Sequence, residues 1–89
     1  MKNRRYIELQ LRALAGRKRM DIILFLRKNG VASSAKIAKE IRLSRPATSQ
    51  HLMHLYDAGI VHSLKRGSFV TYRLSLKQSK LVKGILADL

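Results

Sequence analysis

The sequence predicts a mostly helical α+β fold that runs helix, helix, helix, helix, β-hairpin, helix along a single domain, residues 1–89. Three observations predict it: apolar residues recur at helical spacing, two short helices lie about four residues apart, and two β-prone segments follow them. Hydrophobic residues make up 46% of the chain, which is enough for a folded core. A domain this small buries only about 60–70% of its unfolded surface, so an interface between subunits would add stability.

Two helices are expected in the first third of the chain. Residues 4–15 place apolar side chains on one side, which predicts an amphipathic helix. Residues 17–29 are too apolar all round for an exposed helix, so we expect a buried central helix that ends at Asn29-Gly30. The apolar positions are Ile7, Leu11 and Leu14 in the first segment and Met20, Ile23, Leu24 and Phe25 in the second.

A shorter helix should come next. Val31 and Ala32 could form a very short strand, after which Ser33 or Ser34 caps the helix "AKIAKEIRL". The inner face of this helix should carry Ile37, Ala38 and Ile41, and its outer face Lys36, Lys39 and Arg42.

The stretch "LSRPATSQHLMHLYDAG", residues 43–59, predicts a helix with a polar front. Ser44 is a good N-cap, because its hydroxyl can accept a hydrogen bond from the N–H of Ala47. Pro46 then falls in the first turn, where its missing N–H has no intrahelical partner to lose. Gly59 ends the helix. The side chains expected to face the core are Thr48, Leu52, Leu55 and Tyr56.

Residues 60–65 and 69–75 read as two strands joined by the basic turn Lys65-Arg66-Gly67-Ser68. They are short, so a single antiparallel hairpin is expected, with one buried face. A last amphipathic helix covers residues 77–88. Two short helices followed by a basic hairpin predict a winged helix-turn-helix. The buried face of the hairpin should carry Val70, Tyr72 and Leu74.

Charge is the strongest compositional signal. The chain has 19 Lys and Arg against 5 Asp and Glu, a net charge of +14. Such an excess on a folded domain indicates a polyanionic partner, and double-stranded DNA fits best; a merely soluble surface is the alternative. There is no cysteine, no apolar run long enough for a membrane span and no evident targeting segment. We therefore expect a cytoplasmic protein with no membrane partner.

The polar front of residues 43–59 is expected to enter the DNA major groove. Gln50 can pair with adenine, and Arg45 with guanine. The predicted DNA contacts of this helix are Arg45, Pro46, Ala47, Ser49, Gln50 and His54. The predicted contacts of the hairpin turn, or wing, are Lys65, Arg66 and Ser68, and those to phosphate are Lys36, Lys39 and Arg42.

No catalytic residue, metal site or cofactor is expected. The carboxylates are few and scattered, and there is no glycine-rich phosphate loop. His51, His54 and His62 lack a cysteine or carboxylate that would complete a tetrahedral metal site.

The two terminal helices, residues 4–15 and 77–88, carry more apolar surface than a small core needs, which favours a homodimer. Covering the central helix is the alternative role for these stripes. The residues expected at the dimer interface are Ile7, Leu11, Leu14, Leu81, Val82, Ile85 and Leu86.

Residues 17–75 resemble the ArsR-type winged-helix family of prokaryotic repressors. The resemblance rests on "LS" before the polar helix, "TSQHLMHLYDAGIV" through it and "KRGSFVTYRL" as the wing. It implies a homodimer that is built from the first and last helices, binds an inverted-repeat operator and represses transcription. The base-reading positions of the family fall on Arg45, Pro46, Ser49 and Gln50, although Pro46 replaces a residue that commonly carries a side-chain donor.

The sequence departs from family members that sense metals. Residues 34–42 have no Cys or His, and residues 76–89 offer only Asp88, so the usual metal sites are absent. Two other functions stay open: an architectural protein that coats DNA without sequence preference, and a winged helix used for protein contact. Ser49 and Gln50 disfavour both, because neither function needs base-reading side chains at the front of this helix.

Overall fold

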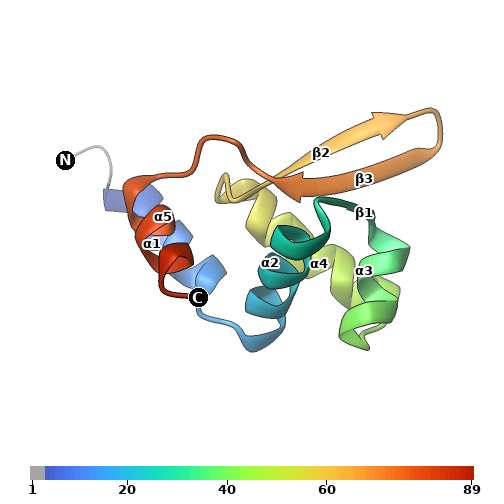
Figure 1. Cartoon of the computed structure of the whole chain (residues 1–89), viewed down its shortest axis with the longest axis horizontal. Helices are drawn as coiled ribbons and strands as arrows, with labels where there is room; N and C mark the ends of the chain where they lie inside the picture. The colour runs from blue at the N-terminus through green and yellow to red at the C-terminus, as the bar shows by residue number, and fades with distance from the viewer. Residues whose placement is uncertain (1–3) are drawn as a thin grey trace.

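The computed structural model describes residues 4–89, so the first three residues of the expected 1–89 domain lie outside it. This part of the chain contains five helices and three strands, arranged as in Figure 1. In order they are α1 (Arg4–Leu14), α2 (Arg17–Asn29), β1 (Val31–Ser33), α3 (Ser34–Ile41), α4 (Arg45–Asp57), β2 (Val61–Arg66), β3 (Phe69–Leu74) and α5 (Lys80–Ala87). The predicted winged helix-turn-helix is confirmed, with α3 and α4 as the helix pair and the β2–β3 hairpin as the wing.

The three strands form one antiparallel sheet in the order β1-β3-β2. The expectation that the short strands would make a hairpin alone was wrong. β1 adds to the other edge of β3, pairing Val31 with Arg73 and Ser33 with Thr71. Without β1, the outer edge of β3 would have unpaired backbone N–H and C=O groups. The three residues of β1 pair with this edge in the part of β3 from Thr71 to Arg73.

The core gathers around α2. Ile22, Ile23 and Leu26 are buried, which confirms α2 as the central helix. Gly30 ends α2 with a φ of 85°, and its N–H donates to the carbonyl of Leu26. Leu24, expected inside, is 36% exposed, because one side of α2 still faces solvent. The other large side chains with almost no exposed surface include Ile37, Leu52, Leu55, Ile60, Val61 and Val82.

The hairpin extends beyond the helices at one end of the molecule (Figure 1). The expected buried face of β3 is therefore buried only in part. Tyr72 and Leu74 pack against the core, whereas Val70, closer to the turn, is outside the core cluster. The correction follows from strand length, because the helices cover only the base of the sheet.

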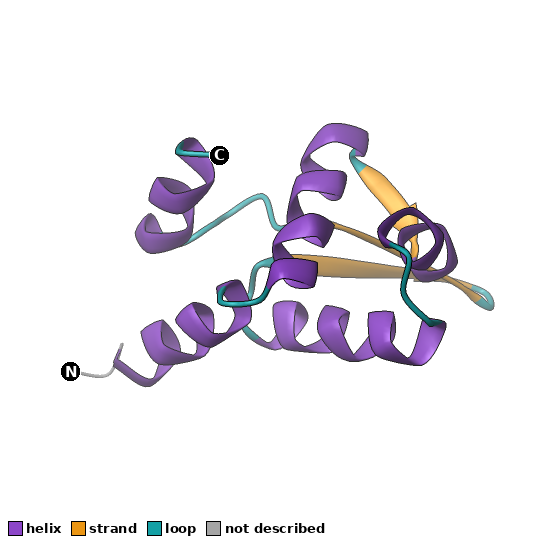
Figure 2. Ribbon diagram, turned by 90° about the horizontal axis from the view of Figure 1, so that it is seen from below, coloured by secondary structure: helices purple, strands orange, loops and turns teal. Residues whose placement is uncertain are grey.

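Serine side chains cap the N-termini of α3 and α5. The Ser33 hydroxyl accepts a hydrogen bond of 3.1 Å from the N–H of Lys36, at the start of α3. The Ser79 hydroxyl accepts one of 3.2 Å from the N–H of Val82, at the start of α5. This second cap explains why α5 begins at Lys80 and not at residue 77, where the sequence pattern placed it. Figures 1 and 2 place α1 and α5 at one end of the molecule and the hairpin turn at the other.

Candidate nucleic-acid interface

The N-terminus of α4 is built as the sequence predicted. Ser44 has an extended backbone, and its hydroxyl accepts a hydrogen bond of 3.2 Å from the N–H of Ala47. Pro46 lies in the first turn, where it fixes a helical φ and removes no intrahelical hydrogen bond. The proline and the serine therefore start the helix at Arg45.

One side of α4 anchors it to the core. Thr48, Leu52 and Leu55 are buried, as expected. Tyr56, also expected to face the core, is 49% exposed, because it lies at the flank of the buried side of α4. The buried side sets the rotation of the helix, so the opposite side must face outward. The side chains on that outward side include Arg45, Pro46, Ser49, Gln50, Met53 and His54, all of them exposed, and Ala47, which is half-buried.

The polar side chains of this outward side have no internal partner. Within residues 4–89, those of Arg45, Ser49 and Gln50 form no hydrogen bond or ion pair with the rest of the chain. An amide, a hydroxyl and a guanidinium that the fold does not use can bind an external acceptor or donor. These are the groups that read base edges in the major groove.

The C-terminal end of α3 is fixed by a left-handed residue and by a hydrogen bond from α2. Arg42 ends α3 in the left-handed conformation, with a φ of 60° and an exposed side chain. Lys18, from α2, donates a hydrogen bond of 2.7 Å to the carbonyl of Ile41. Lys18 therefore has a structural role at the end of α3. Lys39 and Arg42 remain exposed cations beside α4, as phosphate contacts would require.

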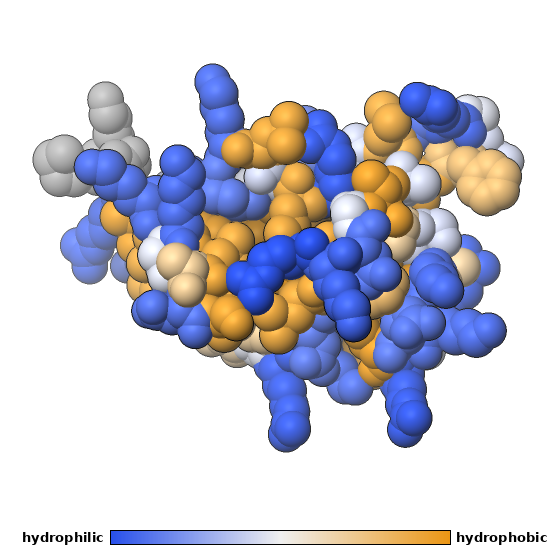
Figure 3. All heavy atoms as spheres, in the orientation of Figure 1, coloured by the Kyte–Doolittle hydropathy of each residue, from blue (hydrophilic) through white to orange (hydrophobic). Residues whose placement is uncertain are grey.

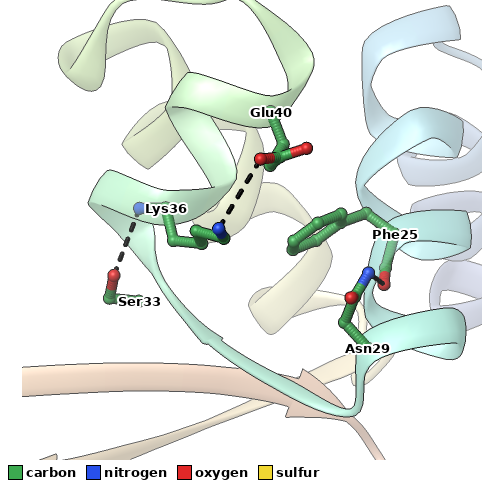
Figure 4. Close-up of polar contacts among 5 residues, drawn as sticks. All are labelled: Phe25, Asn29, Ser33, Lys36 and Glu40. Atoms are coloured by element: carbon green, nitrogen blue, oxygen red, sulfur yellow. Dashed lines mark hydrogen bonds and ion pairs between the residues drawn. The ribbon is translucent and has the colours of Figure 1, made fainter.

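Lys36 differs from the other two basic residues of α3. Its ammonium lies 3.6 Å from a carboxylate oxygen of Glu40, one turn further along the helix. Figure 4 shows both side chains pointing toward Phe25 of α2. The charge of Lys36 is thus partly neutralised on the side of α3 that faces α2. Of the three expected phosphate contacts, Lys36 is the one that the structure supports least.

The wing turn is compact and basic. Gly67 has a φ of 60° and Ser68 a negative φ, which is the pattern of a type II′ hairpin turn. Lys65, Arg66 and Ser68 are all exposed around it. The turn therefore presents two cations on a narrow loop at the far end of the sheet.

Sequence reasoning missed two features, one at the wing turn and one at the C-terminal end of α4. Phe69, expected only as a β-forming residue, is 71% exposed beside the wing turn. Gln10 is 1% exposed inside the predicted apolar side of α1, where its amide contacts the end of α4. A polar residue between apolar helix positions was the available signal for Gln10, but its partner is 48 residues away.

His51 lies partly buried in a positively charged environment. Burial lowers the pKa of the His51 imidazole below its usual value of 6.5, and the positive charges of Arg19 and His54 lower it further. Across residues 4–89, no group of three or more His, Cys, Asp and Glu side chains lies close enough to hold a metal ion. In the same part of the chain, no helix is long and apolar enough to cross a membrane.

The terminal helices expose an apolar surface, but with different residues from those expected. Ile7 and Leu11 are 43% and 47% exposed. Leu14 and Val82, also expected at a dimer interface, are buried within the subunit, so they belong to its core and leave no surface for a partner. The half-buried members of the expected set are Leu81, Ile85 and Leu86.

Comparison with known proteins shows which family the sequence matches. Residues 16–63 match the family model described as "Bacterial regulatory protein, arsR family". The transcriptional activator HlyU of Vibrio cholerae is 33% identical over 76 residues, which cover 85% of this chain and 69% of HlyU. The arsenic resistance transcriptional regulator ArsR1 of Pseudomonas putida is 29% identical over 75 residues, covering 84% of this chain and 59% of ArsR1.

Solved structures agree over nearly the whole length. HlyU from Vibrio cholerae superposes with a TM-score of 0.78 at 32% identity, covering 97% of this chain and 89% of HlyU. NolR from Sinorhizobium fredii superposes with a TM-score of 0.81 at 28% identity, covering 98% of this chain and 83% of NolR. The shared region includes the helix pair, the wing and both terminal helices.

Proposed function

The chain belongs to the arsR family of bacterial regulatory proteins and is a DNA-binding transcriptional regulator rather than an enzyme, and we propose that it acts as a homodimeric repressor on an inverted repeat. In this proposal α4 enters the major groove and reads base edges with Arg45, Ser49 and Gln50. Lys39, Arg42 and the wing residues Lys65 and Arg66 bind phosphates and fix the register. The protein works in the cytoplasm, where it meets DNA.

One observation carries the base-reading role. The polar end of α4 is exposed and unused by the fold, while its opposite side is held in the core by Thr48, Leu52 and Leu55. Because the core contacts fix the rotation of α4, these hydrogen-bonding groups are all held toward the same external partner. Gln50 has the two-pronged amide that pairs with adenine, and Arg45 the fork that pairs with guanine.

The homodimer rests on the apolar surface at the terminal helices. Ile7 and Leu11 on α1 lie at the same end of the molecule as Leu81 and Ile85 on α5. Burying this surface against a second copy removes it from water and relates two α4 helices by a twofold axis. Helices placed about 34–36 Å apart would enter successive major grooves, which is why we expect an inverted repeat.

Repression is the simplest consequence of such a complex, because a dimer seated on a promoter excludes other proteins from the same grooves. HlyU is named a transcriptional activator, so the direction of control requires its own measurement. A reporter gene placed behind the selected site should be expressed less when the protein is present. Higher expression would contradict repression and leave DNA binding intact.

Selection from a random duplex library tests the proposal. We expect an enriched motif with two inverted half-sites about one helical turn apart. A single half-site without symmetry would contradict the dimer. No enriched motif, with affinity that collapses as salt rises, would instead favour the architectural alternative.

Sedimentation of charge-substituted variants tests the dimer separately. Leu11→Asp should dissociate the dimer, because it places a charge in the apolar interface. Leu76→Asp is the matched control, since Leu76 is 83% exposed in the loop before α5. Equal sedimentation of both variants and the unmodified protein would place the interface elsewhere.

A further inference from the structure

The outward side of the wing tip combines an aromatic ring with a cation. Phe69 is directly paired with Arg66 across the two-residue turn, and directly paired residues in an antiparallel sheet lie on the same face. Leu64, two residues before Arg66, lies on that face as well and is 52% exposed. We call Leu64, Arg66 and Phe69 the tip patch. Figure 3 shows hydrophobic and hydrophilic side chains side by side at this end of the molecule.

The tip patch has no role in holding the subunit together. The other face of the sheet supplies Val61, Tyr72 and Leu74 to the core, whereas Leu64 and Phe69 are outside the core cluster. Phe69 is 71% exposed, the largest value among the exposed aromatic side chains of residues 4–89. The ring at the end of the projecting hairpin therefore adds apolar surface that is free to be covered by a partner.

The surroundings of the tip patch specify the chemistry of that partner. Arg66 belongs to the tip patch and Arg73 lies on the same face of the hairpin, and neither takes part in an ion pair among residues 4–89. The partner must therefore offer negative charge beside an apolar surface. Duplex DNA does so in its minor groove, where phosphates border the sugar rings and base edges. The narrow Gly67-Ser68 turn suits a groove about 6 Å wide.

We propose that Phe69 inserts into the minor groove beside the half-site that α4 reads, partly separating two stacked base pairs, while Arg66 binds the adjoining backbone. Apolar side chains that enter the minor groove in this way kink the duplex. The inference rests on the proposed function, since α4 must first place the wing against the flanking DNA. It adds a source of specificity without hydrogen bonds: flanks with flexible TA or CA steps should bind better than stiff A-tracts.

The test uses duplexes that carry the selected site and a fluorescent 2-aminopurine in the flank. Binding of the unmodified protein should raise the 2-aminopurine fluorescence, because the base loses its stacking neighbour. Phe69→Ala should abolish the increase and weaken binding to TA-flanked duplexes roughly tenfold, near the lower end for an aromatic contact with a base. On A-tract flanks the same variant should bind almost as the unmodified protein does. Leu76→Ala removes an exposed apolar residue away from the wing and serves as the control.

The outcomes separate the inference from the proposed function. If the unmodified protein prefers the selected site but Phe69→Ala changes neither affinity nor fluorescence, Phe69 does not insert between base pairs and the inference is overturned. If Phe69→Ala weakens binding equally on every flank, the ring contributes contact but no deformation, which also overturns the inference. If the unmodified protein shows no preference for the selected site, the proposed function itself fails. Thermal unfolding of Phe69→Ala should match the unmodified protein, because the ring is exposed.

Discussion

The side-chain amide of Gln10, in α1, donates a hydrogen bond of 3.1 Å to the backbone carbonyl of Ala58, the C-cap residue that follows α4. The oxygen of the same amide accepts a hydrogen bond of 2.8 Å from the hydroxyl of Ser79. That hydroxyl also caps α5, through the N–H of Val82. One buried amide therefore links both terminal helices to the C-terminal end of α4.

Replacing Gln10 should destabilise the fold measurably. Gln10→Leu leaves the Ala58 carbonyl and the Ser79 hydroxyl without their partner, so the free energy of unfolding should fall by about 1–3 kcal/mol. Urea denaturation measures the loss. Glu8→Gln is the control, because Glu8 is exposed and pairs only with Arg4 at 3.5 Å, on the surface. Equal midpoints for the two variants would mean that the buried hydrogen bonds contribute nothing.

Stability should fall in mild acid, partly through His51. Burial and the charges of Arg19 and His54 lower the pKa of His51 in the folded protein, so below about pH 6.5 the unfolded chain binds more protons. Neutral His51 costs the folded protein no stability above the ordinary histidine pKa. As the pH falls toward the lower pKa of His51 in the folded protein, the unfolded chain is stabilised by protonation first. The free energy of unfolding should therefore decrease between about pH 7.5 and pH 5.5.

The variant His51→Gln should show a smaller decrease over the same pH range, because its side chain does not titrate. His62→Gln, on the exposed part of the sheet, is the matched control and should retain the decrease. If the pH dependence of His51→Gln equals that of the unmodified protein, His51 is not its source.

Gln50 should govern the choice of sequence more than the strength of binding. Gln50→Ala should reduce the preference for the selected site over random DNA by about 1–3 kcal/mol, the usual value of a two-pronged contact with a base. Its affinity for random DNA should change little, since that binding comes from phosphate contacts. Parallel titrations with both duplexes measure the difference. Equal losses on both would refute base reading by Gln50.

Lys39 should show the opposite behaviour. Lys39→Ala removes one phosphate contact, so it should weaken binding to all DNA similarly and reduce the salt slope by roughly one unit. Lys36→Ala is the informative comparison, because Lys36 is paired with Glu40 and should change the slope less. A slope that stays constant in Lys39→Ala would remove Lys39 from the interface.

Local sequence patterns were sufficient to predict most of the fold. The cap at Ser44, the proline in the first turn of α4 and the stop at Gly30 depend only on neighbouring residues, and all are confirmed. The pairing of β1 with β3 was missed because it joins segments about forty residues apart, and nothing in three residues specifies that partner. The local sequence pattern therefore predicts the ends of a helix or strand better than it predicts the element against which that helix or strand packs.

The same limit applies to the apolar helix stripes. The spacing of α1 grouped Ile7, Leu11 and Leu14 on one side, yet only Leu14 is buried in the subunit. A helical wheel shows which residues lie together but not what covers them, so core and interface residues looked alike. Strand alternation did carry a signal for Phe69, because a buried face with Val70, Tyr72 and Leu74 puts Phe69 on the opposite, outer face.

The most direct test of base-specific binding by α4 is a titration of the selected duplex and its scrambled counterpart with the unmodified protein at about 0.15 M salt. We predict that the selected duplex binds roughly a thousandfold or more tightly, within the usual range for specific regulators. Equal affinities for the two duplexes would contradict the account, and the exposed side chains at the front of α4 would then have no role in reading sequence.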